Sequence, residues 1–215
     1  MSSSMKVPVQ NRSRERVEQI LKTAKELIGE KGIDAVSMRE IAQTAGIQIG
    51  SLYQYFPGKS TLLLSIMTEY YDFMFEETKR ILDPVRTIEE LEIASEKAFK
   101  QFVSVFQKDP ALANLWAGAR AIPELVQEDN RDTYRNADLM IRTMIRCLPT
   151  LKESELRPFA LYFSHTLGMI VRFVREIDSE HGKAVLRETL DILKLKLREF
   201  DSLAKKKAKV KKRIS

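Results

Sequence analysis

The residues with reactive or metal-binding side chains do not form a pattern typical of an enzyme. Residues 58–60 (Gly-Lys-Ser) are similar to the end of a phosphate-binding loop, but such a loop needs a glycine where Tyr53 stands and a strand in front of it. The two histidines are far apart, and Cys147 is the only cysteine, so no disulfide or thiolate metal site can form within the chain. We therefore predict a protein that is not an enzyme and needs no metal or cofactor.

A polar and aromatic cluster at Gln48–Tyr55 favours a different chemistry, the recognition of DNA bases. The carboxamide of Gln54 can both donate to and accept from adenine, and a good bidentate pair gives about 1–3 kcal/mol of discrimination. An exposed Ile49 would pack on a thymine methyl group, a contact that distinguishes bases without hydrogen bonds. Gly50 has no side chain, so DNA could approach its backbone closely.

Glycine and capping residues predict two short helices that position this cluster. Ser37, with Glu40 three residues later, is typical of a capping box that begins a helix, and Gly46 ends that helix. In the next short helix Leu52 and Phe56 share one face, which would pack inward and leave the other side chains free. Two short helices joined by a glycine turn, after a longer first helix, form a helix-turn-helix arrangement.

The hydrophobic periodicity predicts an all-α protein, because no alternation of period two is sustained. Glycines concentrate in the first 58 residues, which predicts short elements there and long helices behind them. Helices are expected over residues 17–31, 37–45, 48–56, 60–82, 87–108, 110–121, 124–148, 153–177 and 183–203.

The segment 37–59 closely resembles the signature of the TetR family of bacterial repressors, roughly R-x-I-A-x-x-A-G-V-S-x-G-x-L-Y-x-x-F-x-x-K. With the first helix included, the resemblance covers residues 15–75. It implies an N-terminal three-helix helix-turn-helix DNA-binding domain and a larger C-terminal helical domain for ligand binding and dimerisation. The residues in register are Arg39, Ile41, Ala42, Ala45, Gly46, Gly50, Leu52, Tyr53, Phe56 and Lys59.

Three residues depart from the family pattern. Gln48 stands where the family favours serine, so the usual hydroxyl cap of the recognition helix is absent. Ile49 replaces a polar or basic residue. Ser60 replaces an acidic residue, which removes a favourable charge from the start of the fourth helix.

The resemblance and the side-chain chemistry together assign the DNA contacts. Ser37, Tyr53 and Lys59 would contact phosphates, which fixes the position of the protein on DNA without selecting a sequence. Gln54 would make the main base contact. The expected DNA-binding residues are Ser37, Arg39, Gln48, Ile49, Gly50, Ser51, Tyr53, Gln54, Tyr55 and Lys59.

The resemblance also implies a homodimer formed by the last two helices, which would bind a palindromic operator. Small residues recur every four positions on the helix 153–177, and leucines recur at steps of three and four on the helix 183–203, as in paired helices. Each helix must also face its own core, so some of these residues are internal. The expected interface residues are Ala160, Ser164, Gly168, Leu186, Leu190, Leu193 and Leu197.

A pocket for a small-molecule effector, between the fourth and eighth helices, is a further implication of the resemblance. Aromatic residues and methionines form adaptable apolar walls, so a mostly apolar effector that releases the DNA is expected. For any one of these residues, packing in the core is the alternative. The candidates are Tyr70, Phe73, Phe99, Phe102, Phe106, Trp116, Arg120, Met140, Met144, Phe163, His165 and Met169.

The charge is unevenly distributed along the 215 residues, with a very basic segment at 204–215 within a net charge of +6. Basic segments favour polyanions, although this one could be a helix, a solvated tail or a non-specific DNA arm. The expected divisions are a flexible N-terminal arm (1–11), the helix-turn-helix domain (12–58), the effector-binding and dimerisation domain (59–203) and a basic C-terminal tail (204–215).

Two other functions remain open, a helical protein-binding adaptor without an effector and a TetR-type activator. The polar surface of residues 53–55 argues against the adaptor, because a scaffold has no need of it. No membrane partner is expected, since no uncharged stretch reaches the about 20 residues of a membrane helix. Residues 1–11 lack the apolar segment of a secretory signal, so a cytoplasmic location is expected.

Overall fold

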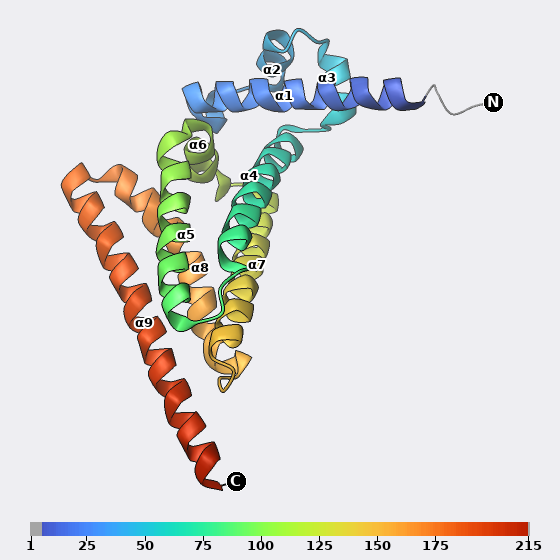
Figure 1. The fold of residues 1–215 in the computed structure, drawn as a ribbon. Coiled ribbons are helices and arrows are strands. Elements are labelled where there is room, and N and C mark those ends of the chain that lie inside the picture. The colour runs from blue at the N-terminus through green and yellow to red at the C-terminus, as the bar shows by residue number, and fades with distance from the viewer. Residues whose placement is uncertain (1–5, 215) are drawn as a thin grey trace. The chain divides into compact units, whose positions relative to one another are not determined.

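The structure is a computed structural model that describes residues 6–214, and every regular element in this part of the chain is a helix (Figure 1). The all-α prediction is therefore confirmed. No helix in this range is long and apolar enough to cross a membrane. The helices are α1 (Lys6–Ala35), α2 (Met38–Thr44), α3 (Ile49–Tyr55), α4 (Lys59–Leu82), α5 (Ile88–Lys108), α6 (Pro110–Ala119), α7 (Pro123–Cys147), α8 (Glu153–Glu176) and α9 (Ser179–Ile214).

The described chain divides into two compact units. Residues 6–70 and 109–128 form the first unit, and residues 71–108 and 129–214 form the second. The first unit thus contains α1, α2, α3 and α6, together with the beginnings of α4 and α7. The expected divisions at 11/12, 58/59 and 203/204 stay sequence predictions.

In the first unit, α1 packs against α6 and α2, and α2 packs against α3. Gly32 has φ 78° and ψ 167°, so the regular part of α1 ends there, as its sequence predicts. The side-chain amide of Asn114 donates to the carbonyl oxygens of Ile28 at 2.9 Å and Gly29 at 3.1 Å. These carbonyls lie in the last turn of α1, where the helix itself leaves acceptors unpaired. Asn114 therefore joins α6 to the end of α1.

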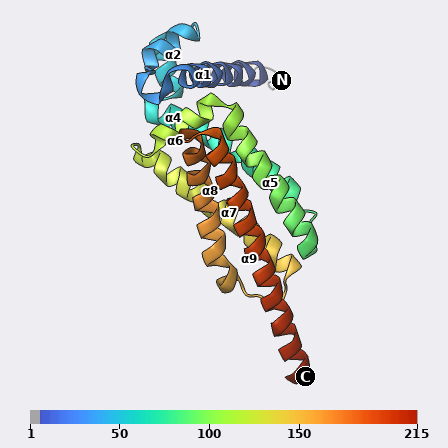
Figure 2. The same cartoon turned by 90° about the vertical axis from the view of Figure 1, so that its left-hand side faces the viewer.

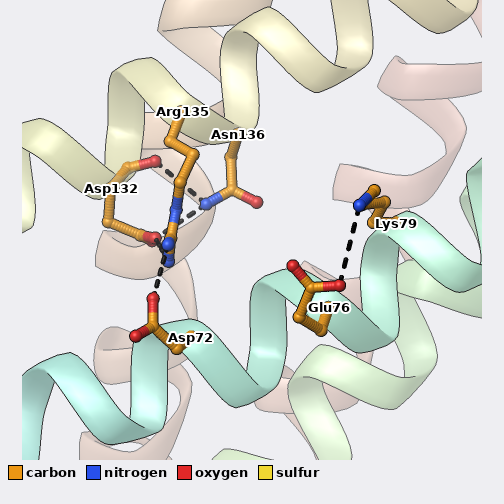
Figure 3. Close-up of polar contacts among 6 residues, drawn as sticks. All are labelled: Asp72, Glu76, Lys79, Asp132, Arg135 and Asn136. Atoms are coloured by element: carbon orange, nitrogen blue, oxygen red, sulfur yellow. Dashed lines mark hydrogen bonds and ion pairs between the residues drawn. The ribbon is translucent and has the colours of Figure 1, made fainter.

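In the second unit, α9 packs along α8 and α5 (Figure 2). Glu96 of α5 accepts a hydrogen bond from Lys194 of α9 at 2.5 Å. The later part of α4 is joined to α7 through Arg135, which donates to Asp72 at 2.5 Å and to Asp132 at 2.8 Å (Figure 3). Ion pairs between helices thus supplement the apolar core of this unit.

The first and last helices are longer than the sequence predicts. α1 begins at Lys6, so residues 6–11 are helical, while residues 1–5 of the expected arm lie outside the described residues. α9 continues to Ile214 instead of ending near residue 203, and in Figure 1 it runs past the turn between α7 and α8. The chain has no glycine or proline after Gly182, and lysine is a good helix former, so nothing in this sequence ends the helix.

Candidate nucleic-acid interface

The start of α2 is fixed by a local capping arrangement. The Ser37 side-chain oxygen accepts a hydrogen bond from the Glu40 backbone N–H at 3.2 Å. Lys31 donates to the Glu40 carboxylate at 2.5 Å, and this hydrogen bond is the main reason why the pKa of Glu40 lies below its usual value. The Ser37 backbone N–H lowers that pKa by a smaller amount. The predicted capping residues therefore act together.

The turn between α2 and α3 depends on Gly46, which has φ 66°. The backbone N–H of Ile47 donates to Ala42, and that of Gly46 donates to Gln43. This pair of bonds is the Schellman arrangement, which needs a left-handed residue at the position of Gly46. The Gln19 side chain of α1 also donates to the Ala45 carbonyl at 2.9 Å, so α1 holds the turn directly.

One face of α3 is buried, and it fixes the helix on the first unit. Leu52 and Phe56 are both buried, and Leu52 is fully so. Gln48 occupies the N-cap position with no side-chain capping bond, as its departure from the family pattern predicts. Apolar packing, rather than a side-chain cap, therefore positions α3.

The opposite face of α3 is open to solvent. Ile49 is 39% exposed and Tyr53 is 48% exposed, both high values for large apolar or aromatic side chains. Gln54 is also exposed. All ten predicted DNA-binding residues lie between Ser37 and Lys59, on or next to α2 and α3. Of these, Ser37, Arg39, Gln48, Ile49, Gly50, Tyr53 and Gln54 are exposed, and Ser51, Tyr55 and Lys59 are half-buried.

Gly50 differs from Gly46 in a way that bears on function. Gly46 has a positive φ that disfavours any side chain. Gly50 has no such φ, and a Cβ atom added there would meet nothing within 4 Å. The fold of the described chain therefore does not require glycine at position 50. A glycine at position 50 would, however, allow another molecule to approach the backbone of α3 closely.

The twelve predicted effector residues are divided between the two units and differ in burial. Tyr70 donates to Asp109 at 2.7 Å, and burial followed by this hydrogen bond raises the pKa of Tyr70. An open groove of about 780 Å³ in the first unit contains Tyr70 but none of the other eleven. The set divides into buried Phe99, Phe106, Trp116 and Met144, half-buried Tyr70, Phe102, Met140 and Phe163, and exposed Phe73, Arg120, His165 and Met169. Tyr70, Trp116 and Arg120 belong to the first unit, and the other nine belong to the second.

The predicted interface residues on α8 and α9 are mostly buried within the single chain. Leu193 and Leu197 pack inside the second unit, and Ala160 is fully buried there. Gly168 and Leu190 are also buried, while Ser164 and Leu186 are half-buried. A different apolar set is exposed on the same two helices, namely Tyr162, Met169 and Phe173 of α8 and Ile192, Leu195 and Leu203 of α9.

The sequence analysis does not predict the contacts that two residues make in support of the helix-turn-helix segment. Gln19 contacts Ala45, and Asn114 contacts the end of α1, each across a long stretch of chain. The partner of a polar side chain on a helix cannot be read from the neighbouring residues, so the sequence alone predicts neither of these two contacts. In the described residues no group of three or more His, Cys, Asp or Glu side chains could hold a metal ion.

Known proteins resemble this chain most clearly in this segment. The family model described as "Bacterial regulatory proteins, tetR family" matches residues 20–66. The chain is similar to the HTH-type transcriptional repressor KstR of Rhodococcus jostii, with 31% identity over 124 residues, which cover 54% of this chain and 56% of KstR. It is also similar to the uncharacterized HTH-type transcriptional regulator YerO of Bacillus subtilis, with 32% identity over 188 residues, which cover 83% of this chain and 64% of YerO. The chain thus spans less than two thirds of the length of both curated relatives.

A solved structure extends the likeness of fold beyond that segment. A TetR-family transcriptional regulator from Streptomyces coelicolor aligns with 88% of this chain and 99% of its own, with a TM-score of 0.66. Its sequence identity to this chain is 18%, so the match bears on the fold alone.

Proposed function

Because the chain belongs to the TetR family of bacterial regulatory proteins, which regulate transcription and are not enzymes, we propose that it is a repressor that binds operator DNA as a homodimer. The observation that carries the proposal is the exposed face of α3. That face lies opposite the buried Leu52 and Phe56, and it presents side chains that suit the major groove of DNA.

The contacts divide into two classes. Gln54 hydrogen-bonds to a base edge, and Ile49 packs on a thymine methyl group. Ser37, Tyr53 and Lys59 hydrogen-bond to phosphates and fix the position of α3 in the groove. Arg39, Gln48, Ser51 and Tyr55 lie beside these residues and complete the surface, and Gly50 allows the backbone of α3 to approach the DNA.

The homodimer uses the exposed apolar residues of α8 and α9 rather than their buried leucines. An exposed apolar surface on two adjacent helices is typical of an association site. Leu195, which is 64% exposed, is expected to lie at the contact with the second copy. A dimer presents two copies of α3, which matches half-sites about 34–36 Å apart on an operator.

The change Leu195→Glu tests this interface, because it adds a charge to the apolar contact. Light scattering after size exclusion is expected to give a monomer with weakened operator binding. Ile93→Glu is the matched control, since Ile93 is 72% exposed on α5, and it is expected to remain a dimer. A dimeric Leu195→Glu variant would contradict the interface.

The effector is a mostly apolar small molecule that binds among the aromatic residues and methionines of the second unit. The rings of Phe102 and Phe106 contact each other there in a tilted arrangement, with centroids 5.1 Å apart, and Met144 is fully buried. Such a ligand is expected to weaken operator binding by about 1–3 kcal/mol. Calorimetry with apolar compounds tests this, and a lack of saturable binding together with unchanged DNA release would contradict it.

The main experiment measures binding to the DNA that flanks the protein's own gene, against unrelated DNA at several salt concentrations. A complex that survives competitor, with two chains per site, is expected. Gln54→Ala should cost about 1–3 kcal/mol, or roughly a 5- to 150-fold loss of operator preference, without changing stability. Gln127→Ala removes another exposed glutamine and should change nothing.

An operator preference that Gln54→Ala leaves unchanged would contradict the assignment of this residue. Weak binding that is equal on both DNAs and that disappears with salt would contradict sequence-specific repression at this site. A protein that binds its operator and raises transcription there would be an activator instead of a repressor.

A further inference from the structure

The end of α9 is a helical segment with an unusual charge. Residues 205–214 contain seven lysines and arginines and no acidic residue. Ala204, immediately before them, is the last buried side chain described in α9. The segment therefore extends from the core of the second unit, and Lys205, Lys206, Lys209 and Lys212 are exposed to solvent.

Two contacts fix the base of this segment on the rest of the unit. The Thr150 hydroxyl, in the turn before α8, donates to the Ala204 carbonyl at 3.0 Å. Lys207 donates to both carboxylate oxygens of Glu155 at 2.6 Å, and this contact is the main reason why the pKa of Glu155 is lowered. These contacts give the segment a defined direction, as a continuation of α9.

The five lysines of the segment whose side chains the structure describes fall into two groups. Lys205 pairs with Asp201 at 2.5 Å, and Lys207 pairs with Glu155, so their charges are compensated inside the protein. Lys206, Lys209 and Lys212 are exposed and form no ion pair with any described residue. With a helical rise of about 1.5 Å per residue, these three uncompensated charges extend over about 9 Å.

We propose that residues 205–214 are a second DNA-binding element, which binds the phosphates of duplex DNA without sequence preference. Uncompensated cations on a helix neutralise phosphates and release the counterions condensed on DNA, which drives association. The segment has no aromatic side chain on which unpaired bases could stack, so a duplex is favoured over a single strand. Its composition also lacks the large apolar face of a helix that lies on a membrane.

Two charge-neutralised variants of the full-length protein test the proposal on duplex DNA without an operator. The triple variant K206Q/K209Q/K212Q removes these three uncompensated lysines. The double variant K205Q/K207Q removes the paired ones and serves as the matched control. Affinity is measured between 50 and 200 mM salt, and circular dichroism checks that both variants keep their helices.

The triple variant is expected to bind more weakly than the wild type. Its slope of log affinity against log salt should fall by about 2.7 per chain, since each lost phosphate contact contributes about 0.9. The double variant should change the slope by less than a third of that amount, because its lysines are already neutralised by carboxylates. An equal slope for the triple variant and the wild type would overturn the proposal.

A membrane partner gives a different outcome. If the triple variant binds DNA like the wild type and loses sedimentation with phosphatidylserine vesicles that the wild type shows, the segment binds membranes and the proposal fails. The same experiments also distinguish a failure of this proposal from a failure of the proposed repressor function. Loss of salt-dependent binding in the triple variant, with no operator preference in the wild type, would support this element and contradict sequence-specific repression.

Discussion

The two surfaces proposed to contact DNA, α3 and the basic end of α9, differ in what surrounds their exposed side chains. In α3, Leu52 and Phe56 hold a helix of seven residues whose exposed side chains are mostly uncharged. In the end of α9, a hydrogen bond from Thr150 and an ion pair with Glu155 hold a helix whose exposed side chains, where the structure describes them, are mostly lysines. Base contacts require fixed positions, whereas attraction to phosphates requires mainly charge, so the better-packed surface is the one suited to selecting a sequence.

Among the predicted changes, Leu52→Ala is expected to have the largest effect, because it should impair the α3 surface and leave the α9 surface intact. It removes the fully buried side chain beneath α3 and should lower the free energy of unfolding by about 2–5 kcal/mol. Operator preference should be lost, while salt-dependent binding through α9 persists. Denaturant unfolding and DNA titration at low salt measure the two effects separately.

Ile49→Ala is the matched control for Leu52→Ala, because Ile49 lies on the exposed face of the same helix. It should change the free energy of unfolding by no more than about 0.5 kcal/mol and still weaken operator binding. If Leu52→Ala kept its operator preference, the buried face would not be what positions α3.

The local parts of the DNA-binding surface could be predicted because each depends on neighbouring residues. Ser37 and Glu40 are three positions apart, and Gly46 supplies a conformation that few other residues adopt. Helical geometry also explains why Leu52 is buried while residues on the opposite face of α3 are exposed. Such features are encoded within one or two turns, and the structure contains them where the sequence indicates.

The second unit was less predictable, because its long helices carry apolar residues on more than one face. Periodicity identifies Leu193 and Leu197 as a seam, but it does not say whether the seam contacts the same chain or a second copy. The chain buries both against its own core and leaves Ile192 and Leu195 exposed. Only the packing of segments distant in sequence determines which face is buried. The same holds in the first unit for the contact of Asn114 with the end of α1.

Substitutions of Gly46 and Gly50 are expected to have the next largest effects, on stability and on operator binding respectively. Gly46→Ala places a side chain at φ 66° and should cost about 1–2 kcal/mol of stability. Gly50→Ala lies in a helix with free space around the new methyl group, so it should leave stability unchanged or raise it by up to about 1 kcal/mol.

DNA titration separates the two glycine variants further. Gly50→Ala should weaken operator binding although its fold is intact, because the methyl group prevents close approach of the DNA. Its binding to non-operator DNA through α9 should be unchanged. Full operator affinity in Gly50→Ala would show that the backbone of α3 is not in close contact with DNA.

The smallest expected effect concerns the part of α9 that precedes its basic end. Hydrogen bonds from Lys100 and then Lys194 lower the pKa of Glu96 to about 2, and the Glu96 side chain is 30% exposed. A carboxyl group whose pKa is lowered on folding stabilises the protein above its unfolded pKa of 4.5, and this contribution is lost as the pH falls towards 2. The pair should therefore stabilise the protein at neutral pH and lose that effect in acid.

Thermal unfolding of wild type and Glu96→Gln between pH 7 and pH 2 measures this contribution. At pH 7 the variant should melt no more than about 2–4 °C lower, since a partly exposed ion pair contributes up to about 1 kcal/mol. The difference should shrink below pH 4.5 and in concentrated salt. Asp191→Asn removes an exposed carboxylate of α9 that has no ion pair to any described residue, and it should change the melting temperature little at pH 7. Because Glu96→Gln also leaves Lys194 uncompensated, it should slightly strengthen binding to non-operator DNA, whereas a fall in that binding would contradict the link between unpaired lysines on α9 and phosphate binding.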